Sequence, residues 1–179
     1  MSKNILFILS GSIACFKACN LLSQFVKEGH KVKTACSKNA LQFIGLATLE
    51  GLSRTSVYHD MFASRKAGTE HISLSQWADI TLLCPASGDV INKMAAGIGD
   101  DCATTLFLSH DFKKPFIVAP AMNQNIYTHP ATRDSLKKLA SWGVEVLPTA
   151  EGSQACGDIG PGRMLEPVEI YQAVSKYLK

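Results

Sequence analysis

A chain of 179 residues is long enough to bury one core, so we expect a single domain over residues 1–179. The net charge of +3 is small and no run of lysine or arginine exceeds two residues, which argues against nucleic acid as a partner. No apolar run reaches the roughly 18 residues needed to span a bilayer, and the run at 5–9 is too short for a signal peptide. We therefore expect a cytoplasmic protein with no membrane partner.

Short apolar runs alternate with helix-period segments along the chain. The run at 4–9 is typical of a strand buried on both faces. Further strands are predicted at 31–36, near Val57, and at 79–87, 115–123 and 144–147. Helices are predicted after the first strand up to Gly29, after Ser37, around 90–98, at 131–142 and from Pro167 onward, from apolar residues at helical spacing and from capping residues. The stretch 52–78 is the least regular and is expected to be largely a loop.

This alternation predicts an α/β fold, namely a single-domain Rossmann-like (flavodoxin-like) three-layer sandwich with a parallel sheet. Ligands of such sheets bind at the carboxyl ends of the strands. The residues expected there are rich in hydroxyl and amide groups: Ser10-Gly11-Ser12, Ser37, Pro85-Ala86-Ser87, Pro120-Ala121-Met122-Asn123 and the stretch 152–164. A polar binding site is therefore predicted at one edge of the sheet.

The turn after the first strand, SGSIA, favours an anion because hydroxyl groups stand where a helix begins. It lacks the three glycines of the dinucleotide fingerprint, and the second strand ends in Cys36-Ser37 instead of an acidic residue. A P-loop lysine motif is absent from the sequence as well. A mononucleotide with one phosphate therefore fits better than NAD or ATP. Helix capping is the alternative interpretation of Ser12 and Ser37.

The stretch GSQACGDIGPGRM, residues 152–164, contains four glycines and one proline. Such a composition excludes a helix and disfavours a central strand, so we interpret it as a loop. Of the six cysteines in the chain, most lie in apolar segments and are expected to be buried thiols. Cys156 is the exception, because its neighbours are polar and loop-forming.

Five stretches, GSIA, EHISL with WAD, PAS, PAMN and GSQACGDIGPGRM, occur in this order across nearly the whole chain. Together they resemble the homo-oligomeric flavin-containing cysteine decarboxylases, and most closely those members that act in coenzyme A biosynthesis. The resemblance implies bound FMN and a carboxy-lyase reaction that converts 4'-phosphopantothenoylcysteine to 4'-phosphopantetheine. In that reaction the flavin transiently oxidises the cysteinyl group to a thioaldehyde, CO2 leaves, and the enethiol is reduced again. The resemblance also implies a homotrimer or homododecamer with the flavin at a subunit boundary.

The residue types at the matching positions suit this chemistry. His71 is a candidate base near neutral pH, the Asn123 amide can bind a carboxylate without neutralising it, and the Cys156 thiol can donate a proton. The resemblance assigns these three residues the catalytic roles. It implies FMN contacts for Gly11, Ser12, Ile13, Ser37, Ser87 and Met122, and no metal. It implies a substrate flap at 151–165, with substrate contacts from Asn123, Ala155, Cys156, Gly157, Asp158, Arg163 and Met164.

Several alternatives stay open. His71 could be a surface histidine, Asn123 a cap for a turn at 124–128, and Arg163 an anchor of its loop. Many family members have alanine, asparagine and threonine where this chain has Gly88-Asp89-Val90, so flavin contacts of Asp89 and Val90 are left open. A flavin prenyltransferase, another FMN-binding relative and a non-catalytic regulatory flavoprotein are the alternative functions. The sequence also leaves open whether the chain is complete or the N-terminal part of a bifunctional decarboxylase-synthetase.

Overall fold

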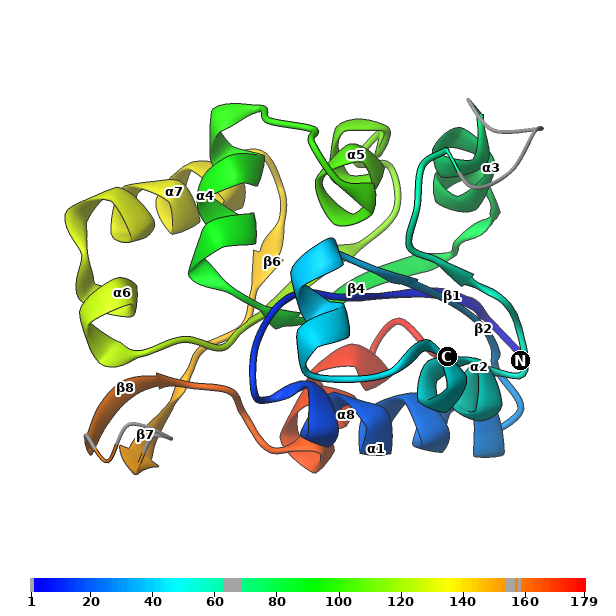
Figure 1. Ribbon diagram of the computed structural model, residues 1–179, viewed down its shortest axis with the longest axis horizontal. Coiled ribbons are helices and arrows are strands. Elements are labelled where there is room, and N and C mark those ends of the chain that lie inside the picture. Colours follow the sequence, from blue (N-terminus) through cyan, green and yellow to red (C-terminus); the bar gives the residue numbers. More distant parts are fainter. Residues whose placement is uncertain (1, 63–68, 154–156, 158) are drawn as a thin grey trace.

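The computed structural model of the chain describes residues 2–62, 69–153, 157 and 159–179. Over these residues a parallel sheet of six strands carries helices on both faces, and an antiparallel hairpin stands apart from it (Figure 1). The order across the sheet is β3 (Val57–Tyr58), β2 (Lys31–Cys36), β1 (Asn4–Leu9), β4 (Ile80–Ala86), β5 (Phe116–Pro120) and β6 (Glu145–Val146). The expected three-layer α/β architecture is confirmed, and its strand order is that of a Rossmann fold.

The central strand β1 shows why the sheet needs two layers of helices. All of its residues after Asn4 are buried, and successive side chains point to opposite faces. Ile5, Phe7 and Leu9 belong to one core, and Leu6 and Ile8 belong to the other. Full burial of one such side chain contributes about 1.5–3 kcal/mol. The continuous apolar run therefore places β1 in the middle of the sandwich.

Two sets of helices cover the two faces (Figure 1). One core is closed by α1 (Cys15–Lys27), α2 (Leu46–Ser53) and α8 (Pro167–Ser175). The other is closed by α3 (Glu70–Trp77), α4 (Gly88–Ala96), α5 (Cys102–Leu108) and α7 (Pro130–Ser141). The short 3-10 helix η1 (Lys38–Gln42) follows β2, and α6 (Gln124–Thr128) follows β5. Among the residues that the structure describes, no helix is both long and apolar enough to cross a membrane.

Two helices differ from what the sequence predicts. The stretch 52–78 is expected to be largely a loop, but α3 occupies its second half. Only Leu74 and Ser75 of α3 are buried. The helix therefore has no repeat of apolar residues at helical spacing by which the sequence could reveal it. The sequence predicts no helix or strand between residues 99 and 114. The structure has α5 there, with Asp101 as the residue that caps its start. The Asp101 Oδ1 atom accepts a hydrogen bond from the Thr104 N–H at 3.0 Å.

The stretch interpreted as a loop contains two strands. β7 (Ala150–Ser153) and β8 (Ile159–Arg163) pair antiparallel, with Ala150 opposite Arg163 and Gly152 opposite Gly160. The loop interpretation was therefore wrong in part. Glycine and proline weaken a central strand, but a hairpin outside the main sheet tolerates them because it needs neither a continuous ladder nor two buried faces.

Candidate functional site

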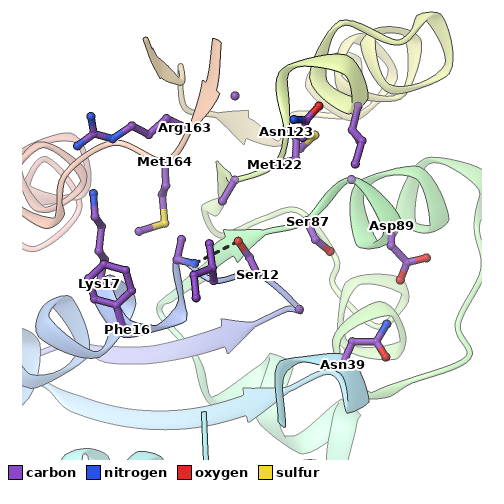
Figure 2. A pocket seen from close by; sticks show the side chains of 17 residues that line it. Ser12, Phe16, Lys17, Asn39, Ser87, Asp89, Met122, Asn123, Arg163 and Met164 are labelled. Carbon is purple, nitrogen blue, oxygen red and sulfur yellow. Dashed lines mark hydrogen bonds between the residues drawn. The ribbon is translucent and has the colours of Figure 1, made fainter. Parts of the chain in front are cut away.

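A cavity of about 560 Å³ opens at the carboxyl ends of the central strands. It lies where the chain after β1 turns to one face of the sheet and the chain after β4 turns to the other. A crevice forms at such a switch point because the two connections diverge. The lining comes from the turn after β1 and the start of α1, the start of α4, the turn after β5 with α6, and the end of β8 (Figure 2). The predicted edge of the sheet is thus the edge that carries the cavity.

Buried hydrogen bonds hold the ends of β1 and β4 together beneath the cavity. The Ser10 hydroxyl donates to the Pro85 carbonyl at 2.7 Å and accepts from the Ser87 N–H at 2.8 Å. One residue along the chain, Gly11 lies against η1, and a Cβ at Gly11 would stand 2.7 Å from the Asn39 Cβ. Glycine is therefore required at position 11 for this close approach.

The structure brings eight of the predicted site residues to the cavity wall: Gly11, Ser12, Ile13, Ser87, Met122, Asn123, Arg163 and Met164. Two of them also cap local structure. The Ser12 hydroxyl accepts from the Ala14 N–H at 3.3 Å (Figure 2), and the Ser87 hydroxyl accepts from the Val90 N–H at 3.5 Å. Ser12 and Ser87 therefore both cap local structure and line the cavity.

Three of the predicted site residues that the structure describes do not line the cavity: Ser37, Gly157 and His71, the last predicted to be catalytic. Ser37 is buried and caps η1, since its hydroxyl accepts from the Ala40 N–H at 3.3 Å. The residue from this segment that does reach the wall is Asn39. Gly157 and His71 are also absent from the described wall. Ala155, Cys156 and Asp158 lie outside the described residues.

The PAMN turn and the hairpin are joined through glycine. The Met122 N–H donates to the Gly162 carbonyl at 2.9 Å. Gly162 has φ +110°, and a Cβ there would stand 2.5 Å from the Met122 carbonyl oxygen. Both features exclude a side chain at this position. The glycines of the stretch 152–164 thus allow two backbones to meet at the wall of the cavity.

The sequence suggests two roles for Asn123. Its amide could bind a carboxylate, or its side chain could cap the turn at 124–128. Its Oδ1 atom accepts from the Asn125 N–H at 2.8 Å, so it does cap α6. It also lines the cavity. The cap fixes the orientation of the side chain, which leaves its amide presented by a rigid turn.

Charged side chains lie at opposite ends of the cavity wall (Figure 2). Lys17 and Arg163 stand at one end beside Met164, and Asp89 stands at the other. Asp89 pairs with Lys93 at 3.3 Å, and Lys93 also pairs with Asp100 at 3.0 Å. The Lys93 ammonium hydrogen-bonds to the Asp100 carboxylate and thereby lowers the pKa of that group.

Phe16, Lys17, Asn39 and Asp89 line the cavity, although the sequence reasoning assigned none of them a role. A signal for two of them was present. Phe16 and Lys17 stand three and four residues after Ile13, and on a helix that spacing places side chains on one face. Asp89 belongs to the stretch 88–90, for which the sequence left flavin contacts open. Asn39 had no comparable signal, because its position depends on how η1 packs.

His71 lies in the first turn of α3, which packs against α5. The His71 carbonyl accepts from the Ser109 hydroxyl at 3.4 Å. At the other end of α3, the Trp77 carbonyl accepts from the Asn4 side chain, at the amino end of β1. Figure 1 shows α3 far from the hairpin β7–β8. Within one chain, His71 is therefore not part of the cavity.

The described cysteines that are fully buried are poor nucleophiles. Burial raises the pKa of Cys15 to about 11 and the pKa values of Cys36 and Cys102 to about 12. Burial also raises the pKa of Cys84. The thiolate is the reactive form, so these thiols are inert at neutral pH. The expectation of buried core thiols is confirmed for these four positions.

Comparison with known proteins gives consistent matches over the whole chain. A family described as Flavoprotein matches residues 1–179. The coenzyme A biosynthesis bifunctional protein CoaBC of Vibrio parahaemolyticus is 39% identical over 178 residues, which are 99% of this chain and 44% of that protein. CoaBC of Bacillus subtilis is 38% identical over 177 residues, 98% of this chain and 43% of that protein. The chain thus spans less than half the length of these curated relatives.

Solved structures match at full length. A cysteine-to-serine mutant of PPC decarboxylase complexed with pantothenoylaminoethenethiol has a TM-score of 0.89 at 31% identity, covering 99% of this chain and 98% of that chain. The FMN binding protein AtHal3 has a TM-score of 0.86 at 31% identity, covering 99% and 97%. The comparison therefore extends over the sheet, the cavity and the hairpin together.

Proposed function

Because the chain belongs to the Flavoprotein family over residues 1–179, we propose that it is an FMN-dependent carboxy-lyase of coenzyme A biosynthesis. It would convert 4'-phosphopantothenoylcysteine to 4'-phosphopantetheine. The observation that supports this most is the full-length likeness to PPC decarboxylase, combined with a cavity whose wall includes residues from four of the five sequence stretches that carry the resemblance. The same assignment predicts action in the cytoplasm on a small molecule, without a nucleic-acid or membrane partner.

The cavity fits FMN in size and in the chemistry of its wall. Its volume of about 560 Å³ is within the range of roughly 300–1,000 Å³ found for small-molecule sites. Ser12 before the start of α1, Ser87 at the start of α4 and Asn39 in η1 offer polar groups, and the start of a helix favours a phosphate. Ile13, Met122 and Ile126 offer apolar surface for a planar ring. These residues would hold the cofactor.

A cysteine carboxylate has no group that can accept the electrons left behind by CO2. When bound, FMN would supply a reversible acceptor of two electrons for the cysteinyl carbon–sulfur unit, and because the same electrons would return to the product, the reaction would be redox-neutral overall. The chain itself must therefore orient the carboxylate, exclude water and move protons.

Asn123 is the residue we assign to the substrate carboxylate. Its side chain is fixed by the bond from the Asn125 N–H, so the carboxylate would meet an oriented neutral group. A neutral donor suits a group that must leave as uncharged CO2, since a cation would stabilise the carboxylate before it leaves. Cys156, proposed as the donor of a proton to the enethiol, and its neighbours Ala155 and Asp158 lie outside the described residues.

We assign His71 to the cavity of a neighbouring copy in a homotrimer or homododecamer. Two observations support this. His71 is remote from the cavity of its own chain, and apolar side chains are exposed at both places. Ile13 and Phe16 beside the cavity are 59% and 58% exposed, and Phe62, on the segment that leads toward α3, is 83% exposed. Two different surfaces that meet each other give a head-to-tail interface, which forms a closed ring such as a trimer when the rotation between copies closes.

Purified protein tests the proposal directly. We expect a yellow protein that releases FMN on denaturation and produces one CO2 for each 4'-phosphopantothenoylcysteine consumed. Cys156→Ser should still release CO2 but accumulate the enethiol, detected by mass as the product lacking two hydrogens. Cys19→Ser, which changes a half-buried thiol that does not line the described cavity, serves as the matched control. Protein without flavin, or flavoprotein that leaves the substrate unchanged, would contradict the assignment.

The relatives described above do not favour the alternative functions. Their names refer to coenzyme A biosynthesis, to PPC decarboxylase and to FMN binding, and none refers to prenyl transfer. The PAMN turn and the hairpin are also both present at the cavity wall. We therefore retain the decarboxylase assignment over a prenyltransferase or a non-catalytic flavoprotein.

A further inference from the structure

Three charged side chains meet at the end of the cavity that is remote from Asp89. Lys17 comes from the first turn of α1, Arg163 from the end of β8, and Glu166 from the residue before α8. The Lys17 Nζ and Arg163 Nη2 atoms both contact the same oxygen, Oε1 of Glu166, at 2.6 and 2.5 Å. Since both cations touch one atom, a single small anion could bridge them in the same way.

The three residues are not equivalent in their relation to the cavity. Lys17 and Arg163 line it, and Glu166 is not among its lining residues. The side chain of Lys17 is 20% exposed, whereas that of Glu166 is 42% exposed. The side chain of Arg163 is 39% exposed, close to that of Glu166, so solvent reaches the carboxylate and another anion could take its place between the two cations.

The balance of charge favours a second anion. Lys17 and Arg163 face the single carboxylate of Glu166, so these three side chains together carry a net positive charge while Glu166 is ionised. The next carboxylate, that of Glu169, accepts a hydrogen bond from the Glu166 N–H at 2.8 Å. Hydrogen bonds from Lys17 and then from Arg163 lower the pKa of Glu166, so it is ionised at neutral pH. Such a partly exposed ion pair contributes little to stability, and exchanging its anion therefore costs little.

The guanidinium of Arg163 also lies against the backbone of Gly152. A Cβ at Gly152 would stand 2.8 Å from the Arg163 Nη1 atom. The lack of a side chain at Gly152 thus leaves room for the guanidinium, and Glu166 pairs with it. A fork of N–H donors beside an ammonium group suits a phosphate better than a carboxylate, because phosphate has more acceptor oxygens and more charge.

We propose that Lys17 and Arg163 bind the terminal phosphate of the substrate, and that Glu166 occupies the two cations until that phosphate displaces it. The inference rests on the proposed function and adds the residues that would select the phosphorylated substrate. The reacting carboxylate would lie toward Asn123, and the phosphate at the other end of the pantothenoyl chain would lie at Lys17. The opposite, Asp89 end of the cavity would repel the phosphate.

A comparison of phosphorylated and unphosphorylated substrates tests this assignment. In the holoprotein, Lys17→Met should lower kcat/KM for 4'-phosphopantothenoylcysteine by about 10- to 100-fold, as expected for a lost charged hydrogen bond. It should change kcat/KM for pantothenoylcysteine by less than about twofold. Glu166→Gln should strengthen phosphorylated substrate binding several-fold, because it removes the competing charge. Lys27→Met, which removes the same charge from the exposed end of α1, should affect neither substrate.

A binding measurement separates this inference from the proposed function. Calorimetric titration of the holoprotein with 4'-phosphopantetheine and with pantetheine needs no turnover, and Lys17→Met should weaken only the former. Flavin content and thermal unfolding check that each variant is folded. Wild-type protein that turns over neither substrate would overturn the proposed function. Equal losses for both substrates in Lys17→Met would overturn the inference, because they would show that the cluster only joins the hairpin to the helices.

Discussion

The parallel sheet and the hairpin β7–β8 are built on different physical principles, although both contribute to the same cavity. The sheet is held by large apolar side chains on both faces, such as Phe7 in one core and Leu83 in the other. The hairpin has few such side chains. It is placed by the close approach of Gly162 to Met122 and by the ion pair of Arg163 with Glu166.

This difference indicates separate consequences for stability and for function. Apolar burial in the sheet supplies most of the free energy of folding. The hairpin contributes little apolar burial, so changes in it should alter the cavity more than the stability of the chain. Substitutions at Phe7 and Gly162 test this contrast directly, and one at His110 tests a buried polar ring that packs on Phe116 of the sheet.

Phe7→Ala should produce the largest loss of stability. Phe7 is fully buried in β1 and packs edge to face against Phe25, with ring centroids 6.4 Å apart. Truncation of such a ring lowers the free energy of unfolding by about 3–5 kcal/mol. Urea denaturation measures this change. Val168→Ala is the control, because Val168 is exposed, and it should change the free energy of unfolding by no more than about 0.5 kcal/mol. Similar losses in both variants would contradict the assignment of the core.

Gly162→Ala should reduce activity more than stability. The new Cβ would meet the Met122 carbonyl oxygen, and the φ of +110° is unfavourable for alanine. We expect the hairpin to move off the PAMN turn at a cost of about 1–3 kcal/mol. Turnover of 4'-phosphopantothenoylcysteine should then fall at least tenfold, while the melting temperature falls only a few degrees.

Gly51→Ala is the control for that substitution. Gly51 lies in α2, where a Cβ would have no neighbour within 4 Å and where the backbone has no positive φ. Alanine there should raise stability by about 0.5–1 kcal/mol, because glycine is unfavourable within a helix. A loss of activity in Gly51→Ala as large as in Gly162→Ala would remove the special role of the hairpin.

Substitution of His110 should have the smallest effect of the three on the free energy of unfolding, and this effect should depend on pH. Its ring is buried and its Nδ1 atom accepts from the Phe112 N–H at 3.0 Å. Burial lowers the pKa of His110, with Asp111 opposing the shift and Lys114 adding to it. Below the unfolded value of about 6.5 the unfolded chain binds a proton that the folded chain does not, so stability falls as pH falls through this window.

His110→Asn keeps an acceptor for the Phe112 N–H and removes the titrating ring. The free energy of unfolding, measured between pH 7 and pH 5, should therefore fall less steeply than in the wild type. Some slope should remain, because burial also lowers the pKa of His30. An unchanged slope in His110→Asn would show that His110 does not contribute to it.

Local patterns in the sequence determined most of the sheet and its helices. The apolar run at 4–9 predicts β1 because a strand buried on both faces must be apolar at every position, and the spacing of Leu21, Leu22 and Phe25 predicts α1 in the same way. The serine and asparagine residues after the strands were expected at one edge for a topological reason. The carboxyl ends of parallel strands always meet at one edge of a sheet.

Tertiary structure decided which of those residues reach the cavity. Ser37 and Asn39 are two positions apart, yet the first caps η1 beneath the surface and the second lines the wall. Lys17, Arg163 and Glu166 come from three segments whose meeting depends on how α1, β8 and α8 pack. A local pattern reports the face of one element, whereas a site depends on the distances between elements. Only the folded chain sets those distances, and they place His71 away from the cavity of its own chain.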